Sequence, residues 1–274
     1  MNIHIYLMEL KRNRFSFLTW CIVIVAIVFL VMAFYPVISG SGIISQMSAL
    51  LESPMMKTWL SAFGADINSL TDVLGFYTTY NSLYVQLLGC IFSIMLASRI
   101  VAKEENKKTA EFLLTRPVTR SEIFISKILS YLTQLVIFNI VLALIGIISL
   151  NIFKSPDAPN FRVDAFLILS LYSFLLMLMM GTIGLLISLL KKRGRAVNGI
   201  SIGIVIGSYF INAMSRISNK VDFIGYISPF KFVNTDVLSN VYKLDWWRLL
   251  YFIGISTVFF IASYNIFKRK DILI

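Results

Sequence analysis

The chain has 274 residues, of which 58% are hydrophobic and only 14% carry a charge. Soluble domains average about 25% charged residues, so this composition argues against an ordinary soluble protein and favours an integral membrane protein. The net charge of +11 is also found in nucleic-acid-binding proteins, but the positions of the basic residues, given below, argue against that class. Cys21 and Cys90 both lie in apolar runs, so neither a disulfide framework nor a metal site is predicted.

Residues 1–14 predict a short amphipathic helix on the membrane surface, which serves either as a simple anchor or as a contact for a partner. Its apolar face has helical spacing: Ile3, Tyr6, Leu7 and Leu10. Residues 15–38 then form an apolar run without a charge, and about 20 such residues cross the hydrocarbon core as a helix. This run is much longer than the apolar region of a signal peptide, so we expect a retained anchor.

The hydropathy pattern predicts an all-α integral membrane protein with a single transmembrane domain over residues 1–274 and six spanning helices. The expected spans are 15–38, 76–98, 124–150, 165–190, 197–215 and 247–267. Because six is an even number, both termini are expected on the same side of the membrane.

The basic residues mark one side of the membrane. Of the 25 lysine and arginine residues, 17 flank the spans on the side that holds both termini, together with six acidic residues. That side therefore carries the whole net charge of +11, while the other side is neutral. Because cytoplasmic loops carry the excess of lysine and arginine in membrane proteins, we expect both termini to be cytoplasmic. The basic excess is thus an orientation signal rather than a nucleic-acid-binding surface.

Two longer segments, 39–75 and 216–246, are then extracellular. Apolar residues at helical spacing predict two short amphipathic helices in the first segment, one with Ile44, Met47 and Leu51 and, after Pro54, one with Met56, Trp59, Leu60 and Phe63. These helices either pack on the outer leaflet or line an exit vestibule for an apolar or amphipathic substrate. In the second segment we expect a helical stretch around 233–242.

The cytoplasmic loop 99–123, between the second and third spans, is the most informative part of the sequence. It contains strong helix formers up to Thr115, with an apolar strip and a charged face, and Pro117 ends the predicted helix. An amphipathic helix too short to cross the membrane needs a cover for its strip. Either lipid headgroups or a groove on a cytoplasmic partner provides that cover.

Within this loop lie an acidic pair, a threonine, an acid, a Leu-Leu pair and a Pro-Val-Thr-Arg run. The residues are Glu104, Glu105, Thr109, Glu111, Leu113, Leu114, Pro117, Val118 and Arg120, with Lys127 opening the third span. This pattern resembles that of the permease subunits of type-two ABC exporters. In that family a glycine usually stands at the position of Lys108 and a serine at the position of Thr119.

The resemblance covers the whole topology and implies several partners. It implies that the stretch from Glu104 to Arg120 forms a coupling helix seated on an ABC ATPase subunit, with the N-terminal helix beside it. It further implies two ATPase subunits, which carry the ATP and Mg²⁺, and a second permease, identical or homologous, that forms the substrate pathway with this one. The location implied is the bacterial cytoplasmic membrane, and this chain itself is expected to hold no cofactor.

The fifth span contains three glycines spaced by four residues: Gly199, Gly203 and Gly207. They share one helical face, and small residues at this spacing let helix backbones approach closely. The face therefore serves either tight packing within one subunit or an interface between two permeases.

The sequence contains no Gly-rich phosphate loop ending in Lys-Ser or Lys-Thr, so no ATP site is predicted in this chain. The only histidine, His4, lies at the membrane surface, and no catalytic or metal-binding residues are predicted. We therefore expect a transport subunit rather than an enzyme. The apolar outer helices fit a lipid-like, antibiotic or amphipathic peptide cargo, as in antimicrobial peptide export or resistance.

Two other classes remain as alternatives. An ion-coupled secondary transporter is the first, although such proteins usually place ionisable residues inside the membrane, and the spans here lack them near their centres. A non-transporting membrane scaffold or a membrane enzyme is the second.

Overall fold

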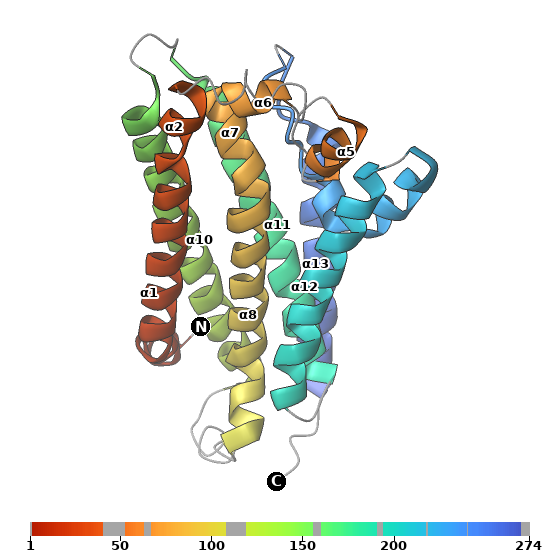
Figure 1. Cartoon of the computed structure of the whole chain (residues 1–274). Coiled ribbons are helices and arrows are strands. Elements are labelled where there is room, and N and C mark those ends of the chain that lie inside the picture. Colours follow the sequence, from red (N-terminus) through yellow and green to blue (C-terminus); the bar gives the residue numbers. More distant parts are fainter. Residues whose placement is uncertain are drawn as a thin grey trace.

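A computed structural model describes residues 2–40, 53–62, 67–107, 119–155, 160–190, 194–217, 219–239 and 241–269. Within these ranges the secondary structure is helical and contains no strand (Figure 1). The elements are α1 (Ile3–Ala33), α2 (Tyr35–Gly40), α5 (Pro54–Ala62), α6 (Ile67–Thr71), α7 (Val73–Tyr80), the π-helix η1 (Asn81–Gln86), α8 (Leu87–Lys107), α10 (Arg120–Phe153), α11 (Val163–Leu190), α12 (Gly194–Ile217), the 3₁₀ helices η2 (Asn219–Ile227) and η3 (Pro229–Phe232), and α13 (Trp246–Arg269).

Six helical stretches are long and apolar enough to cross a membrane: Ile3–Ser39, Val73–Ile100, Arg120–Phe153, Val163–Leu190, Val197–Ile217 and Trp246–Arg269. Each predicted span lies inside one of them, and the predicted fold class, an all-α integral membrane protein with six spanning helices, is confirmed. The long helices run side by side (Figure 1). We call the lower end in that view, where α1 begins, α8 ends and α10 begins, the basal end.

The N-terminal residues are helical and continue directly into the first span. Helix α1 runs without a break from Ile3 to Ala33, so residues 3–14 form its first turns, and their location on the membrane surface stays a prediction. Asn2 caps this helix, because its Oδ1 accepts hydrogen bonds from the backbone N–H groups of His4 and Ile5, at 3.0 and 3.4 Å. The backbone N–H of Asn2 also donates to Ser126 Oγ of α10, at 2.8 Å, which fixes the start of α1 against α10.

The face of α1 that packs against the protein differs from the predicted apolar face. Ile5 and Glu9 are buried, whereas Ile3 and Leu7 are 59% and 54% exposed. Ile3 and Leu7 of the predicted apolar face are thus directed away from the rest of this chain, whereas the hydroxyl of Tyr6 lies 3.1 Å from Thr133 Oγ1 of α10. In a membrane protein that surface is available to lipid, because lipid tails cover apolar side chains as well as a protein core does.

Helices α8 and α11 form the most extensive contact in the bundle. Glycines allow this close approach: a Cβ atom built on Gly184 of α11 would lie 2.6 Å from the carbonyl oxygen of Ile94 in α8. Such a separation is shorter than real Cβ contacts, so even a methyl group has no room there. The core of the transmembrane domain lies along this contact, where Phe92 and Met177 are almost fully buried.

The second span changes helix type in its middle, where η1 joins α7 to α8. A π-turn rotates the side chains that follow it and so directs polar groups to new neighbours. Here the side-chain amides of Asn81 and Gln86 donate to Ser173 Oγ of α11, at 3.4 and 3.3 Å. These buried groups are uncharged and hydrogen-bonded, so they link two spans without placing a charge inside the membrane.

The segments at the end opposite the basal end differ in part from the prediction. Helix α5 agrees with the helix expected after Pro54, and the helix expected at 44–51 falls outside the described residues. The helical stretch expected around 233–242 is wrong, because the helical residues of this segment are those of η2 and η3, and the described residues between 233 and 245 form turns and irregular structure. Ser228 caps η3 and Pro229 opens it, so local capping decides its place.

The glycine contact generates the first prediction. Gly184→Ala should lower the thermal unfolding midpoint of the purified protein, because overpacking against the α8 backbone costs about 1–3 kcal/mol. The matched control is Gly254→Ala in α13, where an added Cβ meets no atom within 4 Å. Detergent-solubilised variants compared by thermal unfolding test this, and equal midpoints for the two variants would contradict the close α8–α11 approach.

Candidate functional site

The predicted coupling residues lie at the basal end, around a gap in the described chain. Glu104 and Glu105 belong to the last turns of α8, which continues beyond the predicted end of the second span. Five of the predicted residues fall outside the described residues: Thr109, Glu111, Leu113, Leu114 and Pro117. Their coupling role stays a prediction, and the structure describes the two helix ends that flank them.

The start of α10 is a capping box. Thr119 Oγ1 accepts a hydrogen bond from the backbone N–H of Glu122 at 3.3 Å, and the Glu122 carboxylate accepts one from the backbone N–H of Thr119 at 3.0 Å. The reciprocal bonds satisfy two backbone donors at the helix start. The signal was present in the sequence as Thr-x-x-Glu ahead of an apolar run, but the sequence analysis did not use it. A serine or a threonine performs this capping equally well, so the departure at Thr119 keeps the same chemistry.

The first turn of α10 is also attached to the end of α13. Arg120 Nη1 donates to the backbone carbonyl oxygen of Lys268 at 3.4 Å. The hydroxyls of Ser121 and Tyr264 are 3.0 Å apart and share a hydrogen bond. Arg120, a predicted coupling residue, thus contacts the last span of this chain.

A buried charge cluster lies one turn farther along α10. We define the basal charge cluster as Glu9, Arg12 and Lys127, of which Glu9 and Lys127 are 0% and 1% exposed. Lys127 Nζ donates to the carbonyl oxygen of Ile100 in α8 at 2.8 Å and lies 3.9 Å from Glu9 Oε1. Arg12 also forms an ion pair with Glu9. The cluster therefore joins α1, α8 and α10 at one point.

Burial makes this cluster sensitive to the loss of any one charge. Removing charged groups from water is costly, and their attraction offsets the cost only while the pairing is complete. Within the described chain, Glu9 Oε2 has no hydrogen-bond partner, so the remaining contacts of this carboxylate carry its stabilisation. From the sequence, Lys127 is predicted to open the third span, and no role is predicted for Glu9. Their pairing cannot be predicted from local sequence, because the two residues are far apart in the chain.

The three glycines of the fifth span occupy an open face of α12. A Cβ atom added to Gly199, Gly203 or Gly207 would meet no atom within 4 Å. On the opposite side of α12, Ser201 and Val205 are fully buried, and α12 packs there against α8 and η2. Among the described residues, no contact supports a role of these glycines in tight packing within one subunit. A role in an interface between two subunits stays a prediction.

The sequence was then compared with known proteins. A sequence model described as ABC-2 family transporter protein matches residues 3–272. This chain belongs to the ABC-2 transporter family. It is also similar to an uncharacterized membrane protein, YdbK, of Bacillus subtilis (strain 168), with 29% identity over 167 residues. That alignment covers 58% of this chain and 63% of YdbK, less than two thirds of the relative.

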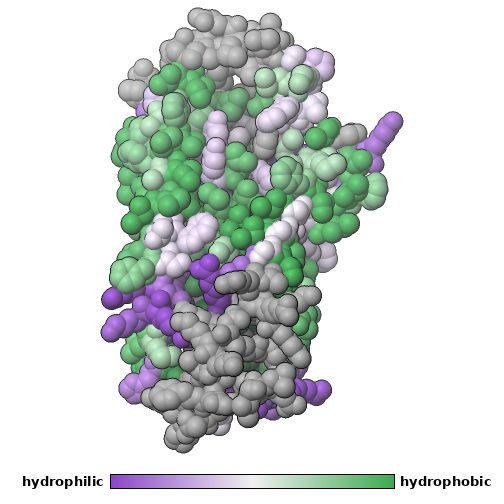
Figure 2. All heavy atoms as spheres, turned by 60° about the horizontal axis from the view of Figure 1, so that its bottom comes forward, coloured by the Kyte–Doolittle hydropathy of each residue, from purple (hydrophilic) through white to green (hydrophobic). Residues whose placement is uncertain are grey.

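Membership of the ABC-2 family identifies the chain as a permease and a multi-pass membrane protein. The surface agrees with this class: Figure 2 shows a hydrophobic flank and a gathering of hydrophilic residues toward the basal end, which is turned forward in that view. Within the described residues, no three His, Cys, Asp or Glu side chains gather in a group that could hold a metal ion. The contacts described at the basal end are ion pairs and hydrogen bonds at helix ends.

The charge cluster generates the second prediction. Lys127→Met should destabilise the permease by about 3–5 kcal/mol, because it leaves the buried Glu9 carboxylate incompletely paired. The double variant Glu9→Gln/Lys127→Met removes both charges and should recover a large part of that loss, since Arg12 is partly exposed and can reach water. Thermal unfolding of the single variants Glu9→Gln and Lys127→Met, of the double variant and of the wild type forms a double-mutant cycle. Additive losses would show that the two charges are not coupled.

Proposed function

We propose that this chain is the membrane-spanning subunit of an ATP-driven exporter and that its basal end docks on separate ABC ATPase subunits. The family match over residues 3–272 carries the proposal, and the coupling pattern between the second and third spans supports it. ATP and Mg²⁺ belong to the ATPase partner in this proposal, and two copies of the ATPase serve two permeases. The basic excess at the basal end supports a cytoplasmic orientation of both termini in a bacterial cell membrane.

The contacts at the basal end suggest how movement of an ATPase reaches the spans. The docking segment lies between α8, which ends at Lys107, and Thr119, which caps α10. A push on this segment acts directly on α8 and α10, which are rigid helices. Lys127 then carries the displacement to α1 through Glu9, and Arg120 carries it to α13. Four of the six spans are thus connected to the proposed docking segment by named contacts.

The ATPase contact generates the third prediction. Leu113→Asp/Leu114→Asp should weaken ATPase docking by well over tenfold, because burying each leucine is worth roughly 1.5–3 kcal/mol and about 1.4 kcal/mol corresponds to one decade. The measurement is recovery of the ATPase with affinity-tagged permease, together with a transport or resistance assay. The matched control, Met55→Asp/Met56→Asp, introduces the same charges in α5 at the opposite end, where Met55 is 77% exposed. This control should leave recovery of the ATPase unchanged.

The outcomes separate the proposal from its alternatives. Equal recovery and equal transport for the Leu113→Asp/Leu114→Asp variant and the wild type would exclude the coupling role. An ion-coupled secondary transporter, a scaffold or a membrane enzyme recovers no ATPase, even with the wild-type chain.

The open glycine face of α12 supports a second part of the proposal, that two permeases meet there and form the substrate pathway between them. Small residues permit close helix contact in a membrane, and this face meets no other element of the described chain. Beside the glycines, Phe210 and Met214 are both 61% exposed, which adds apolar surface to the same side of α12. The partner permease is either a second copy or a homologue.

The permease interface generates the fourth prediction. Gly203→Leu should leave the unfolding midpoint of the single chain unchanged and reduce the dimer fraction, because the added side chain has room within one chain but not between two closely packed helices. Gly254→Leu is the matched control, since it adds the same side chain at an equally open glycine of α13. Cross-linking in membranes, followed by sizing of the purified permease, measures the dimer fraction. A dimer fraction equal to that of the control places the interface elsewhere.

For the cargo we propose an amphipathic peptide, an antibiotic or a lipid-like molecule. The support comes from apolar surface at the end opposite the ATPase, where Met55 and Trp59 of α5 are 77% and 60% exposed. Apolar side chains on a short helix at this position suit a vestibule that an amphipathic molecule crosses on leaving the membrane.

A further inference from the structure

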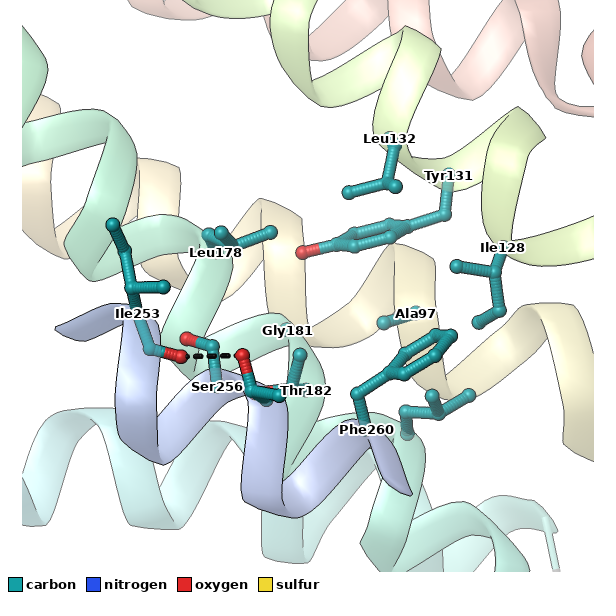
Figure 3. A pocket seen from close by; sticks show the side chains of 12 residues that line it. Ala97, Ile128, Tyr131, Leu132, Leu178, Gly181, Thr182, Ile253, Ser256 and Phe260 are labelled. Atoms are coloured by element: carbon teal, nitrogen blue, oxygen red, sulfur yellow. Dashed lines mark hydrogen bonds between the residues drawn. The ribbon is translucent and has the colours of Figure 1, made fainter. Parts of the chain in front are cut away.

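A cavity of about 240 Å³ separates the middle of α13 from α8, α10 and α11 (Figure 3). Its walls come from four spans, and Figure 3 shows Tyr131 of α10, Thr182 of α11 and Phe260 of α13 around the same space. The glycine face of α12 does not contribute to it. The cavity is therefore separate from the surface proposed for the permease dimer.

Helix α13 is held against its neighbours on both sides of the cavity. Near its start, the backbone N–H of Asp245 donates to Tyr172 Oη at 2.9 Å, and Phe252 is fully buried. Toward the basal end, the Phe124 ring packs against the ring of Phe260 at 5.7 Å. Small side chains line the stretch between these attachments: Ala97, Gly181 and Ser256.

The chemistry of the walls favours an apolar occupant. Among the described residues, no charged side chain lines the cavity. The hydroxyl of Tyr131 is hydrogen-bonded to Ser93 Oγ at 2.8 Å, and the hydroxyl of Thr182 donates to a carbonyl of its own helix. Ser256, which is 5% exposed, has a hydroxyl oxygen without a hydrogen-bond partner within the described residues. An occupant with many polar groups would lose its hydrogen bonds to water without replacing them.

The cavity opens toward the outer flank of the bundle. Ile253 lines it and is 49% exposed, and Thr257, the next lining residue along this side of α13, is exposed as well. All the lining residues belong to membrane-spanning stretches. An occupant therefore enters sideways from the hydrocarbon of the bilayer, in which the available apolar molecules are lipid chains.

We propose that this cavity binds one acyl chain of a membrane phospholipid, held between α10 and α13. The walls from four spans surround the space, and an occupant that touches them gains dispersion attraction at each contact. A methylene chain fills a long apolar space without polar groups to satisfy. The proposal does not rest on the proposed export function, because it concerns one chain and needs no ATPase.

The test uses the full-length chain in vesicles of phosphatidylethanolamine and phosphatidylglycerol that contain a phospholipid with a diazirine in the middle of one acyl chain. After irradiation, labelled peptides are mapped by mass spectrometry. We expect labelling of Ala97 and Tyr131, which are each 2% exposed and are reached only through the cavity. This labelling should saturate as the probe concentration rises. Labelling of Leu144, which is 56% exposed on α10, should rise without saturation.

Two variants fill the cavity from opposite walls: Ser256→Leu from α13 and Thr182→Leu from α11. Each should remove most of the label from Tyr131 and leave the label on Leu144 unchanged. The matched control is Val258→Leu, which changes a 63% exposed position of α13 outside the cavity and should leave both labels unchanged. Two variants are used so that a folding defect in one leaves the other to decide.

Three results would overturn the proposal. The first is wild-type protein labelled at Leu144 and not at Ala97 or Tyr131. The second is labelling of Tyr131 that rises without saturation, which indicates ordinary lipid packing rather than a site. The third is labelling of Tyr131 that persists in both filled variants, which places the chain outside the cavity.

Discussion

The absence of water from the bilayer interior is the constraint on which the rest of this structure depends. Every backbone N–H and C=O group in a span must find a partner inside the protein, so the described chain crosses the membrane as helices. Buried hydroxyls follow the same constraint: Thr78 and Ser149 donate to carbonyls four residues earlier in their own helices. The amides of Asn81 and Gln86 meet Ser173, and the carboxylate of Glu9 meets two cations. Polar groups thus become links between spans.

Helix α10 connects the features of the basal end. Its first turn is capped by Thr119 and attached to α13 through Arg120. Lys127, in its second turn, contacts α1 and α8. One turn farther on, Tyr131 forms part of the wall of the proposed lipid cavity. A lipid chain held there lies against the same rigid helix that leaves the proposed docking segment. The proposed lipid cavity and the proposed docking segment are therefore connected through one helix, α10.

The glycines show where reasoning from spacing succeeds and where it stops. The regular spacing of Gly199, Gly203 and Gly207 marked a face of α12, yet among the described residues no atom lies within 4 Å of a Cβ added at these glycines. The close contact between spans instead uses Gly184, against the backbone of Ile94, and this glycine attracted no attention in the sequence. Spacing along one helix shows which residues share a face. Spacing does not show which helix lies opposite that face, because the neighbouring helix comes from a distant part of the chain.

The sequence by itself determined the class of the molecule, its six spans and the charge difference between its two sides. Hydropathy and charge act residue by residue between water and lipid, so they can be read from a local window. Only the tertiary structure decided that Glu9 and Lys127 pair, that Ile5 and Glu9 of α1 pack inward, and that a cavity lies between α13 and the helices α8, α10 and α11. These features depend on which helices become neighbours. In a membrane that choice rests on side-chain packing and hydrogen bonding between spans, since lipid covers apolar surface equally well everywhere.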